Sequence, residues 1–292
     1  MLPMDTSFLE SFVVVAEHGS MAESARRLNL TPAAIAQRIR ALETEMGVRL
    51  LMRSGRAVRP TEAGFAILER SKDILRDARD LKSVASGSLI SGELRVGAIH
   101  TAMTGLVPGI LGRLTQAHEM LDIFIKPGTS MDLYAEVLNG TLDAAFIVEP
   151  KFSLPKTCRL SSLREEPFVV IAPARHAGED ALSLVRRERF IRYDRNNWGG
   201  HVADNYLKKA GIRPIEYFEL DSLEAIAVMV DRGLGVSLVP DWAPPWPAGL
   251  DLVKLPLPHP SAFRRVGIVS RRSSPRLNVI DTLIEAAYEL AA

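Results

Sequence analysis

The sequence has little of several features that would place a protein outside the cytoplasm. Only one cysteine, Cys158, occurs among 292 residues, which excludes an internal disulfide framework and a thiolate-rich metal site. The longest apolar runs, such as 168–173 and 236–240, are far shorter than the roughly 20 residues that cross a bilayer. The first ten residues lack a basic region followed by an apolar core, so we expect no secretory signal. These absences favour a cytoplasmic protein without a membrane span.

Motifs typical of enzymes are also missing. None of the six histidines falls in a metal-ligand spacing such as HExxH, and no G-x-S-x-G serine or phosphate-binding loop accompanies them. An enzyme therefore stays only as a rival hypothesis, and we expect no catalytic residue, no metal and no bound cofactor. Cys158 is either a redox-sensing thiol or a structural one, and the structural role is favoured because no second cysteine can resolve an oxidised thiol.

What is present points first to nucleic acid. Hydrophobic residues make up 47% and charged residues 24% of the chain, which is typical of a folded globular protein. The net charge is only +1, but the segment 24–59 contains eight arginines against two acidic residues. A local basic block of this size suits DNA, and the average over the whole chain conceals it.

The same region has the pattern of a winged helix-turn-helix, an all-α DNA-binding fold with a short β wing. Apolar residues at helical spacing predict a first helix that ends at Gly19. A capping box at Ser20 begins a second helix, and Thr31 followed by Pro32 begins a third. Two short strands around the turn 54–56 then predict the wing.

Small and polar residues at the exposed start of the third helix suit the major groove, and arginines on the wing suit phosphates or the minor groove. A single arginine is more often a solvated surface charge, but a cluster that follows this helix pattern favours contact with DNA. The candidate DNA-binding residues are Thr31, Pro32, Ala33, Gln37, Arg38, Arg40, Arg53 and Arg56.

The stretch 12–64 resembles the DNA-binding domain of the LysR-type transcriptional regulators. The matching motifs are A-E-x-G-S, A-x-R-L-x-L-[ST]-P, I-x-x-L-E-x-E-x-G-V-x-L-x-x-R and T-E-A-G, in that order and without gaps. The sequence departs from the family pattern at Ala36, where a serine is usual, and at Gln37 and Arg38, which reverse a common Arg-Gln pair. The resemblance therefore implies the fold and the function, and leaves individual base contacts open.

Residues 61–87 are expected to form a long linker helix. The segment has no proline, and Ile67, Ile74 and Leu81 recur every seven residues. One interpretation is a helix packed on its own domain. The favoured one is a dimerisation helix, because an amphipathic element between two domains leaves its apolar line exposed unless a partner covers it. The arrangement resembles the linker helix of LysR-type regulators. That resemblance implies dimers that assemble into a tetramer on a near-palindromic operator.

The remaining residues, 88–292, alternate strand-like and helical segments, which predicts an α/β fold with a largely parallel sheet in two lobes. Lobe I is expected to comprise about 92–162 and 267–292, and lobe II about 163–266. Two such lobes enclose a cleft, where ligands bind at the carboxyl ends of strands. The arrangement resembles the periplasmic-binding-protein-like effector domain of LysR-type regulators. A stand-alone solute-binding protein is a rival hypothesis, but it leaves the N-terminal domain, 1–60, unexplained.

Two predicted strands end in hydroxyl-rich segments that open helices, where backbone N–H groups and the helix dipole suit an anion or carboxylate. By resemblance, Thr101 and Thr129 fall where the family commonly holds an effector carboxylate. The segment 192–201 would supply arginine, amide and aromatic groups from the facing lobe, and capping or packing roles are the alternative. The candidate effector-binding residues are His100, Thr101, Ala102, Thr129, Ser130, Arg195, Asn197 and Trp198.

These features together predict a cytoplasmic transcription regulator that binds double-stranded DNA as a homotetramer. A small organic effector, a co-inducer for which anionic molecules are the first candidates, would shift the assembly between DNA-bound shapes. Such a shift would change the contacts with the operator and the access of RNA polymerase.

Overall fold

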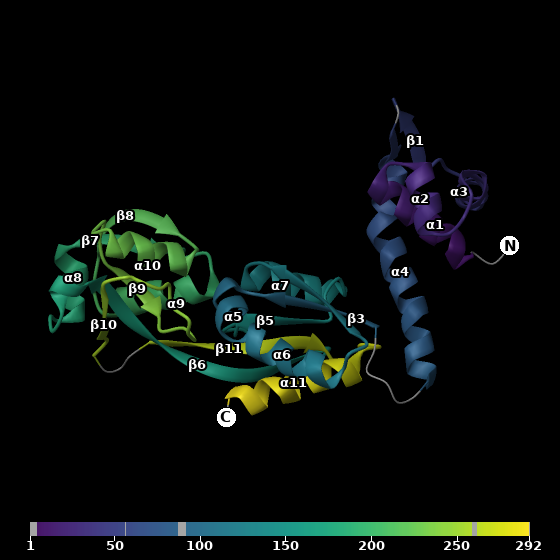
Figure 1. Ribbon diagram of the computed structural model, residues 1–292. Coiled ribbons are helices and arrows are strands. Elements are labelled where there is room, and N and C mark those ends of the chain that lie inside the picture. The colour runs from purple at the N-terminus through teal and green to yellow at the C-terminus, as the bar shows by residue number, and fades with distance from the viewer. Residues whose placement is uncertain (1–4, 56, 87–91, 259–261, 292) are drawn as a thin grey trace. The chain divides into compact units, whose positions relative to one another are not determined.

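The computed structural model divides into two compact units, Met1–Gly92 and Glu93–Ala292, each with a hydrophobic core of its own. The smaller unit is mostly helical, and the larger one is built on β-sheet with helices packed around it (Figure 1). The boundary predicted between residues 87 and 88, and the candidate Arg56, lie outside the part of the chain that the structure describes. The described residues are 5–55, 57–86, 92–258 and 262–291.

The N-terminal unit is a helix-turn-helix followed by a two-stranded wing and a long helix. The side chains of Asp5, Ser20 and Thr31 each accept a hydrogen bond from a backbone N–H in the helical turn that follows. Because these caps satisfy donors that would otherwise have no partner, they determine where the first three helices begin. The elements are α1 (Thr6–His18), α2 (Met21–Arg27), α3 (Pro32–Met46), β1 (Leu51–Ser54), β2 (Ala57–Pro60) and α4 (Glu62–Ser86).

The wing is attached to α3 through Glu43. Its Oε1 accepts hydrogen bonds from the backbone N–H of Leu50 at 2.8 Å and of Leu51 at 3.1 Å. Both leucine side chains are buried in the core that α1 and α3 form. The start of the wing is therefore held by polar and apolar contacts together, which keeps β1 and β2 close to α3.

The long helix α4 packs in part on its own unit. Ile67, Leu68, Ile74 and Leu75 are partly buried against the N-terminal core, whereas Leu81 is 69% exposed. Two of the three residues in the seven-residue repeat therefore contact the helix's own domain. This is the arrangement that the sequence pattern did not favour, and it leaves the C-terminal part of the repeat, at Leu81, on the surface.

The larger unit confirms the predicted two-lobed α/β fold, but the prediction of a largely parallel sheet is wrong. Its main sheet has the strand order β10-β6-β11-β5-β3-β4, with β9 paired to β6. Strands β3 and β5 are parallel, but β11 runs antiparallel to both β5 and β6. The elements are β3 (Gly92–Ala98), α5 (His100–Gly105), α6 (Val107–Ala117), β4 (Leu121–Pro127), α7 (Ser130–Asn139), β5 (Ala144–Val148), β6 (Cys158–Pro173), η1 (Ala174–His176), α8 (Ala181–Arg187), β7 (Arg189–Tyr193), α9 (Trp198–Lys209), β8 (Ile215–Leu220), α10 (Leu223–Asp231), β9 (Ser237–Pro240), β10 (Leu252–Pro256), β11 (Phe263–Arg271) and α11 (Leu277–Ala291).

Strands β6 and β11 lie side by side and pass from one lobe to the other (Figure 1). In lobe I, β11 pairs with β5 over 266–270, and in lobe II, β6 pairs with β9 and β10 over 168–173. Only the end of β6 is an apolar run in the sequence, at 168–173, because the preceding stretch 158–166 is largely polar and half-exposed. The two lobes are therefore joined by long antiparallel strands.

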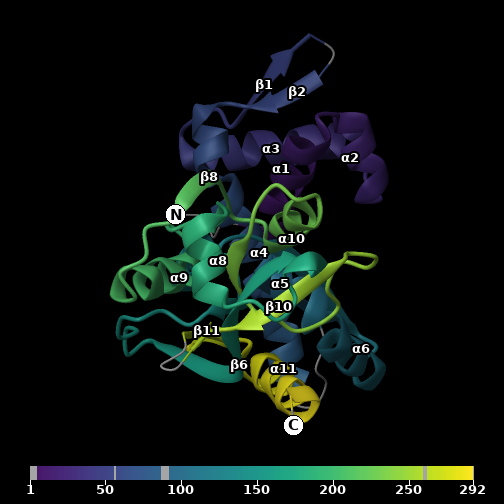
Figure 2. The ribbon, with the colours of Figure 1, turned by 90° about the vertical axis from the view of Figure 1, so that its left-hand side faces the viewer.

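Helices cover the sheet of lobe I, and α11 at the end of the chain packs against α6 (Figure 2). The approach is close at Gly109, where a Cβ atom would lie 2.8 Å from Leu290 Cδ2. The Leu290 side chain of α11 therefore lies directly against Gly109 of α6. No helix in the described ranges is both long and apolar enough to cross a membrane.

Candidate functional site

The exposed face of α3 is the first candidate site. Ile35, Ile39 and Leu42 are buried in the core of the N-terminal unit, which turns the opposite side of the helix outward. A face with small residues at its start, followed by an amide and a guanidinium group, fits the major groove of DNA. The candidate residues on this exposed surface are Thr31, Pro32, Ala33, Gln37 and Arg40.

Arg38 lies on a different side of α3. It is half-buried, and its Nη1 donates a long hydrogen bond of 3.5 Å to the Ser11 hydroxyl of α1. Hydrogen bonds from Ser7 hold the pKa of the Asp5 carboxyl below its ordinary value, and the charge of Arg38 adds to this effect. Arg38 is therefore held near the junction of α1 and α3, whereas Arg40 faces solvent.

A hollow of about 1910 Å³, counting the part open to solvent, lies between α3 and the wing, and Arg40, Arg49 and Arg53 line it. All three are exposed, and the ion pairs of the described part of this unit involve other cations. Arg59 lies opposite Met52 in the antiparallel register, and hence on the other face of the wing from Arg53. Exposed arginines without carboxylate partners keep their charge available for an external anion such as a DNA phosphate.

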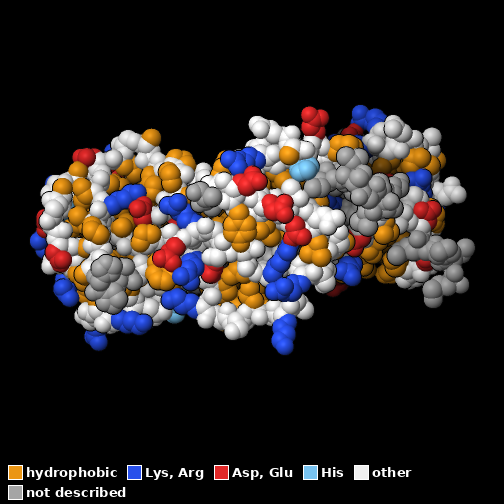
Figure 3. All heavy atoms as spheres, turned by 90° about the horizontal axis from the view of Figure 1, so that it is seen from below, with side chains coloured by type: hydrophobic (Ala, Val, Ile, Leu, Met, Phe, Trp, Pro, Cys, Tyr) orange, Lys and Arg blue, Asp and Glu red, His pale blue; other side chains and the backbone are white. Residues whose placement is uncertain are grey.

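The charge is distributed differently over the face of the molecule shown in Figure 3. There, basic and acidic side chains of the described residues are interspersed with apolar ones and are not gathered by sign. The described side chains on that face therefore form no basic patch like the arginines beside the wing.

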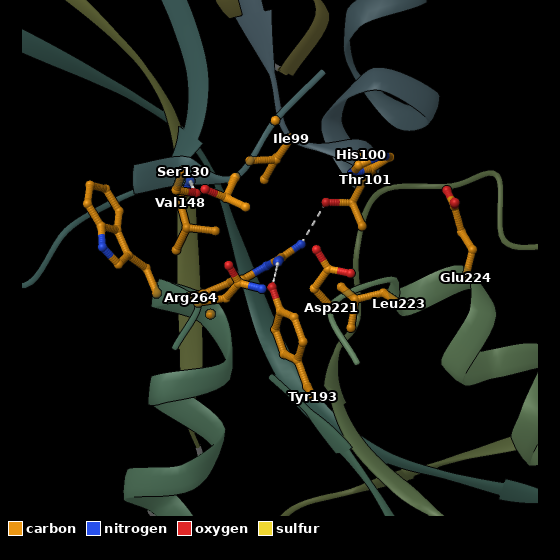
Figure 4. A pocket seen from close by; sticks show the side chains of 15 residues that line it. Ile99, His100, Thr101, Ser130, Val148, Tyr193, Asp221, Leu223, Glu224 and Arg264 are labelled. Atoms are coloured by element: carbon orange, nitrogen blue, oxygen red, sulfur yellow. Dashed lines mark hydrogen bonds between the residues drawn. The ribbon is translucent and has the colours of Figure 1, made fainter. Parts of the chain in front are cut away.

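The second candidate site is a pocket between the two lobes of the larger unit, called here the interlobe pocket. Its space is about 480 Å³, counting the part open to solvent, and residues from both lobes line it (Figure 4). Lobe I contributes the segments that follow β3 and β4 and the last residue of β5, and lobe II contributes the end of β7 and the segments that follow β7 and β8. The carboxyl ends of strands thus meet at the pocket, which is where α/β folds bind ligands.

Arg264 of β11 forms the floor of the interlobe pocket, and its side chain is 1% exposed. Its Nε donates to Glu166 Oε2 on β6 at 2.7 Å, and its Nη2 donates to the Thr101 hydroxyl in lobe I at 2.9 Å. Glu166 Oε1 in turn accepts a hydrogen bond from the backbone N–H of Ala243 in lobe II at 3.1 Å. The buried ion pair therefore connects the two crossing strands with both lobes.

Tyr193 at the end of β7 closes the pocket from the side of lobe II. Its hydroxyl lies 3.5 Å from Arg264 Nη1, as the dashed line in Figure 4 marks. Burial raises the pKa of the Tyr193 hydroxyl above its ordinary value. The phenol therefore stays neutral at physiological pH and offers the pocket both a donor and an acceptor.

Four of the five candidates from lobe I meet in the pocket. His100, Thr101, Thr129 and Ser130 line it, and His100 is the exposed member of the group. Ala102 does not line the pocket, because its side chain is 2% exposed and packs inside lobe I.

The hydroxyl groups of Thr129 and Ser130 already form hydrogen bonds within lobe I. Thr129 Oγ1 caps α7 by accepting a hydrogen bond from the Asp132 N–H at 3.2 Å, and it donates to Asp132 Oδ2 at 2.7 Å. Ser130 Oγ accepts the Val148 N–H at 3.0 Å, so its own hydrogen remains free to be donated. Thr129 therefore has the capping role that was the alternative interpretation, and Ser130 is better placed to donate to a ligand.

The candidates from lobe II separate into two groups. Asn197 and Trp198 line the pocket, but Arg195 does not. The Arg195 guanidinium donates to Glu219 Oε1 at 2.9 Å and to Glu216 Oε2 at 2.6 Å, and these hydrogen bonds raise the pKa of Arg195. A guanidinium engaged by two carboxylates on β8 is not placed to hold an effector.

Trp198 also joins the lobes at the edge of the pocket. Its ring centroid is 5.8 Å from that of Tyr134 and 5.5 Å from that of Phe152, both in lobe I. Tilted and edge-on aromatic contacts of this kind are favourable, so they add to the contact between the lobes.

Arg264, the most buried charge in the pocket, was not among the residues predicted from the sequence. The consecutive Arg264 and Arg265 look alike in the sequence, but alternation along β11 buries the first and exposes the second. The signal in the sequence is the alternation of a strand, which places Arg264 on the same face of β11 as the apolar Val266 and Ile268. A charged residue on the inward face of a strand calls for a buried partner, here Glu166.

Metal and thiol chemistry receive no support from the described residues. Among them, no group of three or more His, Cys, Asp or Glu side chains is arranged to hold a metal ion. Cys158 is 4% exposed at the start of β6.

Comparison with known protein sequences gives matches along almost the whole chain. The profile of the LysR substrate binding domain matches residues 87–292, and that of the bacterial regulatory helix-turn-helix protein, lysR family, matches residues 7–65. The DNA-binding transcriptional dual regulator OxyR of Escherichia coli is 30% identical over 303 residues, which cover 97% of this chain and 94% of its own. The regulator GltR of Bacillus subtilis is 26% identical over 81% of this chain and 80% of its own.

Solved structures give the same result. A mutant OxyR of Corynebacterium glutamicum is 26% identical, with a TM-score of 0.66, and the match covers 98% of this chain and 93% of that one. Full-length CbnR in complex with its target DNA is 22% identical, with a TM-score of 0.69 over 99% of this chain and 100% of that one. At that identity the likeness to CbnR establishes the fold alone.

Proposed function

This chain belongs to the LysR family of DNA-binding transcription regulators, and on that premise we propose that a small organic effector in the interlobe pocket controls its binding to an operator. The observation that carries the proposal is the make-up of the pocket, whose walls come from both lobes and whose floor is Arg264 on a strand that joins them. A molecule that touches both lobes binds one arrangement of them better than another. It thereby biases the conformation of the whole protein.

For the DNA, we assign base contacts to the exposed face of α3 and phosphate contacts to the wing. Ala33, Gln37 and Arg40 are exposed along one side of the helix, which supports a place in the major groove. Arg53 is exposed and without a carboxylate partner among the described residues, which supports a phosphate contact. Thr31 and Pro32 bring the N-terminus of α3 to the same surface. Arg38 helps to hold α3 on α1, and Arg56 remains a candidate.

The working form in this proposal is a dimer or tetramer on a near-palindromic operator. The exposed Leu81 of α4 supports a contact with a second chain, although Ile67 and Ile74 pack on their own unit. The change of shape alters the access of RNA polymerase to the promoter, in the cytoplasm where bacterial DNA lies. Because the family is one of regulators, we assign the chain no catalytic step.

Peroxide sensing is not part of the proposal, although several relatives are named as hydrogen peroxide-inducible genes activators. A thiol that senses peroxide must be accessible and readily ionised. The only cysteine of this chain, Cys158, is 4% exposed. A structural role for Cys158 is therefore the better hypothesis.

A thermal-shift screen of the full-length protein tests the proposal. The compounds are small carboxylic acids, amines and amino acids, and we expect at least one to raise the Tm. A ligand at one hundred times its Kd adds about 2.7 kcal/mol to the stability. The same compound should change the affinity for operator DNA, measured by fluorescence anisotropy.

Two variants give the screen its control. Thr101→Val removes a hydroxyl that lines the pocket, so it should abolish both effects of the compound. Thr115→Val removes an exposed hydroxyl from α6, outside the pocket, and should leave both effects intact. A compound that stabilises Thr101→Val as strongly as the wild type, or that binds without altering the affinity for DNA, contradicts the proposal.

A further inference from the structure

The charge of the interlobe pocket does not suit a simple anion. The positive charge of Arg264 is matched by the buried Glu166, whose Oε2 lies 2.7 Å from Arg264 Nη2. Two more carboxylates, those of Asp221 and Glu224, stand in the wall of the pocket from lobe II. Carboxylates therefore outnumber guanidinium groups around this space, even when Arg164, whose Nε lies 3.8 Å from Glu166 Oε1, is counted. The hydroxyl-rich strand ends alone suggested an anion.

Asp221 is the carboxylate that is best placed to meet a ligand. It is exposed, it forms no ion pair with any described cation, and its side chain reaches toward Thr101 and the end of Arg264 (Figure 4). It is not needed to cap α10, because Ser222 Oγ already accepts the Ala225 N–H at 3.2 Å.

The charge of Asp221 also affects the hydroxyl of Tyr193. Burial raises the pKa of the Tyr193 hydroxyl, the charge and hydrogen bond of Arg264 lower it in part, and the negative charge of Asp221 raises it by a smaller amount. The Asp221 carboxylate therefore acts on the interior of the pocket and not only on solvent. Glu224 lies farther out at the rim, where its Oε1 accepts a long hydrogen bond of 3.4 Å from the Thr104 hydroxyl.

The opposite side of the pocket offers donors to a carboxylate. Ser130 and Thr101 each have a hydroxyl hydrogen that no hydrogen bond given above uses. The helix α9 is 12 residues long, and its N-cap residue Asn197 makes no side-chain capping bond, so N–H groups of its first turn remain for a ligand. The apolar side chains of Ile99, Val148 and Leu223 complete the lining.

We propose that the effector is zwitterionic, a small amino acid or a close derivative, and that Asp221 binds its ammonium group while Thr101, Ser130 and the start of α9 bind its carboxylate. The inference rests on the proposed function, because it needs the interlobe pocket to be the effector site. A unit charge about 4 Å away in a partly dehydrated site changes affinity by about ten-fold or more. Asp221 therefore selects molecules with an amine against those without one.

Matched sets of probes test the selection on the full-length protein. Each of the common L-amino acids is compared with the carboxylic acid that lacks its amine and with the amine that lacks its carboxylate. We expect at least one amino acid to raise the Tm, and both of its analogues to bind at least ten-fold more weakly by calorimetry.

Substitution of the acidic residue supplies the second arm. Asp221→Asn should weaken binding of the amino acid at least ten-fold, and should leave binding of its des-amino analogue unchanged or tighter. The matched control is Glu285→Gln, which removes an exposed carboxylate from α11 outside the pocket and should alter neither affinity. The Tm of unliganded Asp221→Asn should equal that of the wild type, which shows that the fold is intact.

The outcomes separate this inference from the proposed function. If a des-amino acid binds the wild type as tightly as its amino acid, or if Asp221→Asn keeps the preference for the amine, the inference fails and the effector pocket stands. If no compound of the three classes raises the Tm, both are rejected. If a compound binds equally well to Thr101→Val, the site is elsewhere and both are again rejected.

Discussion

Arginine has two different roles in the two units of this protein. In the N-terminal unit, Arg40 and Arg53 are exposed beside the wing and join none of the ion pairs among the described residues. In the larger unit, Arg264 is buried against Glu166, and the buried Arg192 donates to Asp204 at 2.9 Å. These arginines are thus open to an external anion in one unit and paired with internal carboxylates in the other.

The difference has an energetic cause. An exposed guanidinium keeps its hydration, so folding neither gains nor loses much by its presence. A buried guanidinium has lost its water and is tolerated only when a carboxylate and further hydrogen bonds replace it. Substitutions of the first kind should therefore weaken DNA binding without unfolding the protein, and substitutions of the second kind should unfold it.

Arg264→Ala should have the largest effect on stability. It leaves the buried Glu166 carboxylate with only the more distant cation of Arg164, whose Nε lies 3.8 Å from Glu166 Oε1, and loss of one partner costs about 3–5 kcal/mol for buried pairs of this kind. The neighbouring Arg265→Ala, at an exposed pair with Glu165, should cost less than about 1 kcal/mol. Urea unfolding followed by circular dichroism measures both.

A double substitution separates the lost charge from lost packing. Arg264→Met combined with Glu166→Leu removes both charges together and should recover most of the stability lost in Arg264→Ala. Equal stability of Arg264→Ala and the wild type would mean that the pair is not buried in solution, and the contrast between the two units would then be lost.

Arg40→Ala and Arg53→Ala should each weaken binding to operator DNA on the order of ten-fold at fixed salt. A lost phosphate contact also lowers the slope of log affinity against log salt by about 1. The free energy of unfolding should change by less than about 0.5 kcal/mol, because both side chains are exposed. Fluorescence anisotropy over a range of salt concentrations gives affinity and slope together.

Arg265→Ala and Arg38→Ala are the comparisons for this experiment. The first removes an exposed arginine from the larger unit and should leave DNA binding unchanged. The second removes an arginine held near Ser11, and its effect on the salt slope should be smaller than that of Arg53→Ala. A larger effect of Arg38→Ala than of Arg40→Ala on the slope would reverse the assignment of the exposed face of α3.

The contrast also explains how far the sequence could lead. The N-terminal fold depends on local signals, such as the caps at Ser20 and Thr31, which act within a few residues and are visible in any single sequence. The family and the two-lobed fold followed from such motifs and are confirmed. The hydroxyl-rich segments that follow β3 and β4 were predicted near the effector, and four of their residues line the pocket.

The rest of the pocket depends on pairs that are distant in the sequence. Arg264 is separated from Glu166 by 98 residues. No local sequence pattern predicts that β6 and β11 pair and bring the two side chains together. Arg195 was predicted in the pocket as the arginine of the segment 192–201, but Glu216 and Glu219 of β8 hold it instead. The sequence therefore predicts which segments lie near the pocket. The partner of each charged side chain becomes known only from the fold.

The smallest effect is expected at Glu216 and Glu219, two half-exposed carboxylates that pair with arginines. Hydrogen bonds from Arg192 hold the pKa of Glu216, and those from Arg195 hold the pKa of Glu219, below the ordinary value of 4.5. A carboxyl with a lowered pKa in the folded state contributes stability that is fully present above its ordinary pKa. That contribution is lost as the pH falls through the lowered value.

The double variant Glu216→Gln/Glu219→Gln should therefore have a lower Tm than the wild type at pH 7, and the difference should shrink as the pH falls below 4.5. Solvent screening at these half-exposed carboxylates limits each pair to about 1 kcal/mol, and the buried Arg192 keeps Asp204 as its partner, so the difference should be a few degrees at most for a unit of this size. Thermal melts of both proteins from pH 7 to pH 3 measure the difference, in which the titration of all other carboxyls cancels. A difference that stays constant over this range would mean that the two glutamates stabilise lobe II by packing, and that only the buried arginine pairs of the larger unit stabilise the fold through charge.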